Sequence, residues 1–275
     1  MLKNILGLII IATLFSCNNS SNNENKLEND SIPSSEKKMS TNTFYKLPSP
    51  VELYMFLNEE KAKYNNQLLN LPENSNKYIT TTSKAINFGV YTSDLAYNNV
   101  YGENQQTIKY FSISKKIADE LNLVEGFNEK TLKSIDKNIN NKDSLLKIIN
   151  DSYSDVVNLF QDQSKTKLLP LIVTGAWVES VYIAINSINK FSPENNIVLR
   201  IAEQQLLLEN LLDYFKSLPS KDQNKEVFDK LLDLKTSYDK LYDNKNVVIT
   251  KSQFDEISKK ITALRLDFVN NKLNN

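Results

Sequence analysis

Apolar side chains recur at helical spacing along most of this 275-residue chain, beginning near residue 50. Apolar positions at i, i+3, i+4 and i+7 are typical of amphipathic α-helices, and no period of about 30 to 45 residues indicates a solenoid of regular repeats. The pattern predicts an all-α fold, an antiparallel multi-helix bundle of about eight or nine helices. The helices are expected at about residues 50–69, 82–101, 104–123, 128–139, 143–163, 165–189, 194–217, 227–241 and 250–268.

Capping residues and composition support this fold class. Ser49-Pro50 combines an N-cap serine with a proline at the first helical position, and both are favoured at helix starts. The chain contains only 5 Gly and 7 Pro. An all-β protein of this length needs many more turn glycines, so the composition favours few, long helices.

The segment over residues 165–189 is apolar nearly all round, which predicts a central, buried helix. Thr174 and Glu179 interrupt its apolar run, so we interpret it as a core helix and not as a membrane span. Gly89 and Gly175 lie inside predicted helices, where glycine costs about 1 kcal/mol relative to alanine. We therefore expect two helices to approach closely at these glycines, with a ligand contact as the alternative.

The N-terminus has the pattern of a targeting segment. Lys3 precedes an apolar run of 11 residues, which is too short to span a bilayer because a spanning helix takes roughly 20 residues. Leu14-Phe15-Ser16-Cys17 follows and resembles a bacterial lipobox, in which a small residue precedes the acylated cysteine. We therefore predict a lipoprotein signal peptide over residues 1–16 and lipidation of Cys17, the only cysteine of the chain. The alternative is an ordinary secretory signal followed by a chance cysteine.

Residues 17–43 are expected to form a flexible tether between the lipid and a folded domain. Asn18–Thr43 is rich in Asn and Ser and cannot bury enough apolar surface to order itself. A flexible chain of this length spans roughly 25–30 Å. Residues 44–275 are then predicted to form a single all-helical domain.

The predicted location is the bacterial cell envelope, with the outer membrane as the partner through the lipid on Cys17. No acidic cluster follows Cys17, whereas the surface-export signal of Bacteroidetes lipoproteins usually has one. The periplasmic face is therefore favoured over the cell surface. Asp30-Ser31-Ile32 resembles the O-glycosylation motif of that phylum, which makes Ser31 a candidate acceptor.

Charge and composition exclude several classes of function. The 33 basic and 33 acidic residues balance, whereas nucleic-acid-binding proteins usually carry a basic excess. The chain has no histidine and a single cysteine, so catalysis by imidazole and metal sites built from His or Cys are excluded. No metal or cofactor is therefore predicted, and any chemistry would fall to carboxylates, Lys, Tyr, Ser or Thr.

Two carboxylates attract attention because they lie inside largely apolar helical segments. Asp94 follows Gly89 on the second predicted helix, and Glu179 lies on the most apolar one. A buried carboxylate is costly unless it is paired or hydrogen-bonded. In one interpretation each acid only fixes helix packing. In the other, the two acids converge on a ligand-binding cleft walled by aromatic side chains, namely Tyr97, Trp177 and Tyr182.

Arg200 is the predicted partner of these acids. It lies between two aliphatic residues on a largely apolar helix, in a chain that contains only two arginines. Its planar guanidinium suits bidentate pairing with Glu179 or Asp94. The alternatives are that Arg200 extends to solvent or that it pairs with Glu203, one turn further on.

Several short motifs are spread over the folded region: Leu47-Pro48-Ser49-Pro50, Leu68-Leu69-Asn70, Ala85-Ile86-Asn87-Phe88-Gly89-Val90-Tyr91, Asp94-Leu95-Ala96-Tyr97, Ala118-Asp119-Glu120-Leu121 and Gly175-Ala176-Trp177-Val178-Glu179. Together they resemble a set of uncharacterised Bacteroidetes lipoproteins. The resemblance implies no activity, but it favours a joint role for the residues Asp94, Tyr97, Trp177 and Glu179.

We therefore expect a membrane-anchored envelope lipoprotein that acts as a non-enzymatic binding or protein-interaction module. Its partner would be an envelope protein or a small-molecule ligand, and no catalytic residue is assigned. One alternative is a carboxylate-based glycan-acting enzyme, which would require Asp94 and Glu179 to lie roughly 5–10 Å apart in an open cleft. The other alternative is a purely structural envelope protein.

Overall fold

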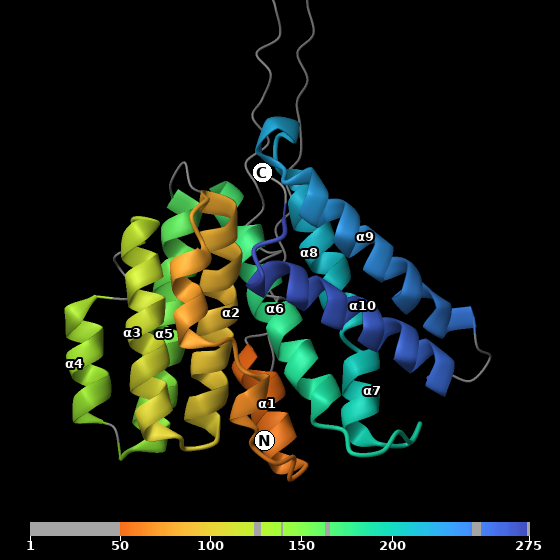
Figure 1. The fold of residues 1–275 in the computed structure, drawn as a ribbon, viewed down its shortest axis with the longest axis horizontal. Helices are drawn as coiled ribbons and strands as arrows, with labels where there is room; N and C mark the ends of the chain where they lie inside the picture. The colour runs from red at the N-terminus through yellow and green to blue at the C-terminus, as the bar shows by residue number, and fades with distance from the viewer. Residues whose placement is uncertain (1–49, 124–127, 139, 163–165, 244–248, 274–275) are drawn as a thin grey trace, which may run out of the picture. The chain divides into compact units, whose positions relative to one another are not determined.

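The computed structural model describes residues 50–123, 128–138, 140–162, 166–243 and 249–273. This part of the chain is all-helical, which confirms the predicted fold class (Figure 1). The predictions for residues 1–43, including those for Cys17 and Ser31, lie outside the described residues. The α-helices of the described ranges are α1 (Pro50–Glu59), α2 (Thr81–Val100), α3 (Asn104–Glu120), α4 (Glu129–Lys137), α5 (Lys142–Asp162), α6 (Leu169–Asn186), α7 (Asn196–Ala202), α8 (Gln205–Ser217), α9 (Lys225–Asp239) and α10 (Lys251–Val269).

Helices α2 and α6 form the most extensive helix pair of the core, and Figure 1 shows them side by side. They cross where Gly89 lies against Gly175, and a Cβ on either glycine would collide with the main chain of the other helix. The contact is reciprocal. Gly89 meets the carbonyl oxygen of Ile172, just before Gly175, and Gly175 meets that of Ile86, just before Gly89. The close approach expected at both glycines is therefore confirmed.

Helix α6 is the central helix that the sequence predicted, and nearly all of its residues are buried. It is the one described helix that is long and apolar enough to cross a membrane by length and composition, with a mean hydropathy of 1.4. Within the domain, 89% of that stretch is buried by other helices. Such burial is typical of a core helix.

Helix α2 is buried as completely as α6, although many of its residues are polar. Every residue from Ala85 to Val100 is buried, including Asn87, Asp94 and Asn98. Polar residues on a helix ordinarily mark a solvated face. Most of these polar side chains are tolerated inside because they are hydrogen-bonded: Asn87 and Asp94 to the main chain of other segments, and Asn98 to the Tyr64 hydroxyl and to its own helix.

The other helices are arranged around the α2–α6 pair (Figure 1). Helices α1, α3 and α5 pack on α2, and α4 packs on α3 and α5. Helices α7, α8 and α10 pack on α6, and α9 packs on α8 and α10. Because α10 contacts both α6 and α2, its side chains reach the region where these two central helices meet.

The first helix is shorter than predicted. Lys61 adopts a left-handed φ of 58°, and the Ala62 amide donates to the carbonyl of Leu57 at 2.9 Å. This is the hydrogen-bond pattern with which many helices end, and it stops α1 at Glu59. Residues 60–80, which we call the connecting segment, then run to the start of α2 without an α-helix.

The segment predicted as one helix over residues 194–217 is two helices, α7 and α8. The chain turns at Gln204, whose amide donates to the carbonyl of Ile201 at 3.2 Å. The Gln204 side chain accepts the Nε1–H of Trp177 on α6 at 3.2 Å. This tertiary contact lies at the break, so apolar periodicity within the segment does not reveal it.

The glycine crossing predicts a large effect of added side-chain volume. We expect Gly89→Ala to lower the free energy of unfolding by about 3 kcal/mol or more, because the new Cβ meets main-chain atoms that have no room to move. Gly102→Ala is the matched control, since Gly102 has a φ of 77° but no atom within 4 Å of a new Cβ. Left-handed strain alone costs about 1–2 kcal/mol there. Urea denaturation followed by circular dichroism measures both changes, and equal losses would contradict the close crossing.

Candidate functional site

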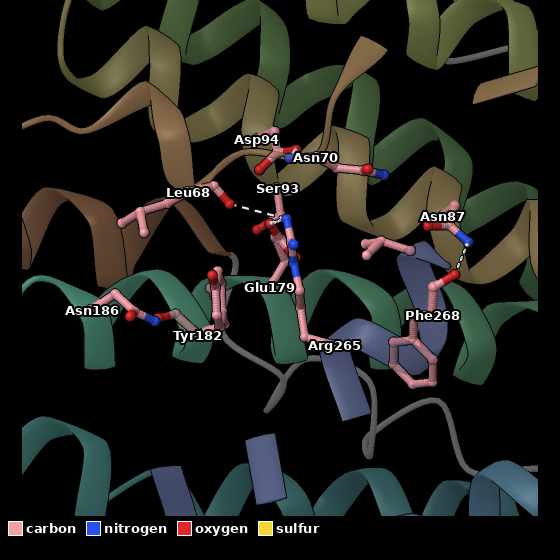
Figure 2. Close-up of polar contacts among 12 residues, drawn as sticks. Leu68, Asn70, Asn87, Ser93, Asp94, Glu179, Tyr182, Asn186, Arg265 and Phe268 are labelled. Carbon is pink, nitrogen blue, oxygen red and sulfur yellow. Dashed lines mark hydrogen bonds and ion pairs between the residues drawn. The ribbon is translucent and has the colours of Figure 1, made fainter. Parts of the chain in front are cut away.

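A buried ion pair joins α6 to α10 (Figure 2). Arg265 donates from Nε to Oε2 of Glu179 and from Nη2 to Oε1, both at 3.0 Å, which is the bidentate geometry that suits a guanidinium and a carboxylate. Glu179 is fully buried, and Arg265 is 8% exposed. The same Nη2 donates to the main-chain carbonyl of Leu68 at 3.0 Å. The guanidinium also lies 4.7 Å from the ring centroid of Tyr182.

Asp94 is the second fully buried acid at this place (Figure 2). Its Oδ2 accepts the main-chain N–H of Asn70 at 3.0 Å, and its carboxyl interacts with that of Glu179. Burial, and then the charge of Glu179, raise the pKa of Asp94 well above its ordinary value, against the lowering effects of Arg265 and the Asn70 amide. We call Asp94, Glu179 and Arg265 the acid–arginine cluster. Asp94 keeps its proton to a higher pH than an exposed aspartic acid does.

Side chains of the helices hydrogen-bond the main chain of the connecting segment. Tyr110 on α3 donates to the carbonyl of Asn70 at 2.9 Å, and Tyr91 on α2 donates to the carbonyl of Leu71 at 2.7 Å. With the bond from its amide to Asp94, Asn70 has both main-chain groups paired with side chains. These bonds satisfy main-chain N–H and C=O groups that would be paired with each other if the segment were an α-helix.

The need for these bonds follows from the conformation of the connecting segment. It contains two short 3-10 turns, Asn66–Leu68 and Pro72–Lys77, and most of its main chain has no helical partner. Leu69 and Asn70 are nevertheless buried. A buried main-chain group that stays unpaired costs free energy comparable to a lost hydrogen bond. The acids and tyrosines of the neighbouring helices supply the missing partners.

The end of α10 is tied into the same network. The Asn70 side chain donates from Nδ2 to the hydroxyl of Tyr78 at 2.9 Å, and Tyr78 donates to the carbonyl of Val269 at 3.1 Å. Asn87 on α2 donates to the carbonyl of Phe268 at 3.0 Å (Figure 2). The connecting segment, α2 and the last turn of α10 are therefore fastened to one another by polar side chains inside the domain.

Tyrosine rings surround the acid–arginine cluster and remain un-ionised there. Burial raises the pKa of Tyr78 to about 12. Burial also raises the pKa values of the other phenols near Asp94, namely Tyr54, Tyr64, Tyr91, Tyr97 and Tyr110. Phenols in this state act as neutral hydrogen-bond donors and acceptors. Tyr78, Tyr91, Tyr97 and Tyr110 hold main-chain groups, whereas Tyr54 and Tyr64 bond to side chains of α2.

The structure brings some of the predicted site residues together and separates others. Asp94, Glu179 and Tyr182 meet at the cluster, and Tyr97 lies beside Asp94, with its hydroxyl accepting a main-chain amide of the connecting segment. Trp177 leaves α6 about 200° around the helix from Glu179, because successive residues are about 100° apart. It faces the α7–α8 turn instead, so the five residues do not wall one cleft.

The pairing predicted for Arg200 is wrong. Arg200 forms an exposed ion pair with Glu203 at 3.3 Å, and its guanidinium lies 4.4 Å from the ring centroid of Phe56. The buried face of α7 is formed by Ile197, Val198 and Ile201. Position 200 therefore faces outward, and the partner of Glu179 comes from another helix.

Arg265 is the residue that the sequence analysis missed. It lies between Leu264 and Leu266, so it carries the same signal that singled out Arg200. It also lies four residues after Ile261 and three before Phe268, and both of these are buried. That spacing puts Arg265 on the buried stripe of its own helix.

The carboxyls of both acids in the cluster are engaged inside the domain. Both oxygens of Glu179 are bonded to Arg265, and Asp94 lies beneath the main chain of the connecting segment. A general acid or base must reach its substrate within hydrogen-bond distance, whereas both acids are fully buried. Across the described ranges, no group of three or more acidic, His or Cys side chains is placed to hold a metal ion.

The buried pair predicts unequal roles for the two arginines. We expect Arg265→Met to lower the free energy of unfolding by about 3–5 kcal/mol, because it leaves Glu179 as an unpaired buried charge. Arg200→Met is the matched control and should cost about 0–1 kcal/mol, because its ion pair is exposed. Replacing both partners, in Glu179→Leu/Arg265→Met, should recover part of the loss. Urea denaturation measures all three, and similar losses for the two single variants would contradict the assignment.

Comparison with known proteins adds no relative from which a role could be transferred. No protein-family model, curated protein or solved structure matches this chain. The functional argument therefore starts from the chain's own residues and from the contacts of the acid–arginine cluster.

Proposed function

We propose that this protein is a lipid-anchored bacterial envelope protein whose helical domain is a non-enzymatic binding or interaction module. The observation that carries the proposal is the position of Cys17, the only cysteine, directly after Leu14-Phe15-Ser16 at the end of an apolar targeting segment. Acyl chains on this cysteine would anchor the chain firmly, since each buried CH₂ contributes ~0.8 kcal/mol. The proposed location is the periplasmic face of the outer membrane, among the Bacteroidetes lipoproteins that the motifs resemble.

The burial of the acids supports a role without catalysis. Hydrolysis of a glycoside by two carboxyls requires both to flank the substrate, roughly 5–10 Å apart. Asp94 and Glu179 instead interact with each other beneath the connecting segment, with no exposed surface.

Binding of a partner would then use the exterior of the domain. The large apolar side chains exposed there are the candidates for contact with a partner: Met55, Leu71, Ile79, Leu199, Leu206, Leu232 and Leu266.

The lipid anchor is testable in a bacterial host that expresses the full chain. We expect the wild-type protein to incorporate an alkyne-labelled fatty acid and to sediment with the membranes. Cys17→Ser should lose both properties, because serine offers no thiol for acylation. Ser16→Ala keeps a small residue before the cysteine and is the matched control, expected to retain label and membrane association. A labelled Cys17→Ser protein, or an unlabelled wild-type protein, would contradict the proposal.

The non-enzymatic role has its own test. We expect the purified protein to release no more sugar product from peptidoglycan or other envelope glycans than its Asp94→Asn variant does, because neither buried acid reaches a substrate. Mass spectrometry of the soluble products measures the release. Products that appear with the wild type and vanish in Asp94→Asn, at unchanged free energy of unfolding, would favour the glycan-acting alternative.

A further inference from the structure

The acid–arginine cluster contains more acidic groups than basic groups. Asp94 and Glu179 are fully buried and Arg265 is 8% exposed, so two carboxyls share one guanidinium. If both acids were ionised, the interior would hold an uncompensated negative charge, which is costly in a medium of low dielectric constant. A single proton between the two carboxyls removes this charge.

The hydrogen bonds indicate where that proton lies. Arg265 occupies both oxygens of Glu179, and the Asn70 amide occupies Oδ2 of Asp94. Oδ1 of Asp94 is buried and has no hydrogen-bond partner among the described residues, yet the Asp94 carboxyl interacts with Glu179. A proton on Oδ1 lets Asp94 donate to Glu179, which pairs the free oxygen and neutralises the acid.

We propose that Asp94 and Glu179 share one proton at neutral pH, and that loss of this proton as the pH rises releases residues 68–71 of the connecting segment from the helices. The segment yields first because the glycine crossing locks α2 against α6, whereas the segment has no α-helix of its own. It is also bonded to both sides of the cluster, through the Asn70 amide to Asp94 and through the Leu68 carbonyl to Arg265. Water that enters beneath it solvates the new charge. This inference does not depend on the lipid anchor.

The phenols with raised pKa values and the guanidinium of Arg265 keep their charge state at neutral pH and moderately above it. Burial raises the pKa values of the phenols on α1, α2, α3 and the connecting segment, to about 12 for Tyr78. Burial disfavours the charged form of Arg265, but the charge and hydrogen bonds of Glu179 outweigh this effect and raise its pKa. The facing groups are Tyr54 on α1, Tyr64 and Tyr78 on the connecting segment, Tyr91 and Tyr97 on α2, Tyr110 on α3, Glu179 and Tyr182 on α6, and Arg265 on α10.

The direction of the pH dependence follows from the raised pKa of Asp94 in the folded state. A group with a raised folded pKa contributes its full stabilisation below its unfolded pKa, which is about 3.9 for aspartic acid. The stabilisation is lost as the pH rises through the raised folded pKa. Opening of the segment releases one proton between these two pKa values. The equilibrium constant for opening therefore rises by up to about tenfold for each pH unit.

Hydrogen exchange of the full-length protein tests the release. We expect the protection factors of amides in residues 68–71, corrected for intrinsic exchange, to fall by up to about tenfold per pH unit as the pH rises from the unfolded pKa of aspartic acid towards the raised folded pKa of Asp94. Amides of α2 and α6 should remain protected. In Asp94→Asn the amide donates to Glu179 permanently, so protection should be independent of pH. Asp119→Asn removes an exposed acid, paired with Lys115 at 2.6 Å, and should behave as the wild type.

Infrared spectroscopy tests the shared proton separately. The wild-type protein at neutral pH should show the carbonyl band of a protonated carboxyl, and Asp94→Asn should lack it. Absence of the band in the wild type, or the same pH dependence of exchange in Asp94→Asn, would overturn the proposal. So would an equal loss of protection throughout α2 and α6, because it would reveal global unfolding. If Asp94→Asn does not fold, Glu179→Gln is the second variant: it removes the charge that adds to burial in raising the Asp94 pKa, so the loss of protection should end at a lower pH and be smaller.

Discussion

The contact of α2 and α6 at two glycines sets the conditions that the rest of the domain has to meet. Because Gly89 and Gly175 let the two backbones touch, the acids that follow them, Asp94 and Glu179, are brought together inside the domain. Two carboxyls in a dry interior require a positive charge, a proton or both. Arg265 supplies the charge from α10, which packs on both α6 and α2.

The polar interior has a second cause in the long connection between α1 and α2. A helical protein with short connections satisfies most of its main-chain groups within its helices. Here a buried stretch around Asn70 runs between helices without an α-helix of its own, and its N–H and C=O groups take their partners from Asp94, Tyr91 and Tyr110. Burial of Asp94 and Tyr91 on α2 is thus accounted for by the main chain that they hold.

The polar groups of the interior and the surface of the protein have different roles. Inside, the acids and the tyrosines are hydrogen-bonded to one another's helices and to the connecting segment, and the buried Oδ1 of Asp94, which has no hydrogen-bond partner among the described residues, leaves a place for a proton. Outside, the proposed function depends on the lipid at Cys17 and on the surface of the helices. An envelope protein is exposed to a less buffered compartment than the cytoplasm, so a proton-dependent segment there would couple its shape to external pH.

The sequence by itself determined the helices, because a helix depends on contacts between residues three and four positions apart. Apolar spacing located nine helical regions, and the two mid-helix glycines predicted the close crossing. The end of α1 at Glu59 and the break at Gln204 were missed, because the left-handed Lys61 and a contact with Trp177 are not encoded in apolar spacing.

For the site, the sequence identified Asp94 and Glu179 as acids that need a partner, since the cost of burying a carboxylate is a property of the residue and its neighbours. Only the tertiary structure decided that the partner is Arg265 and not Arg200, because Glu179 and Arg265 are separated by 86 residues along the chain. Such a contact depends on how α6 and α10 pack. The same packing determined that the acids are sealed beneath the connecting segment and not open to a cleft.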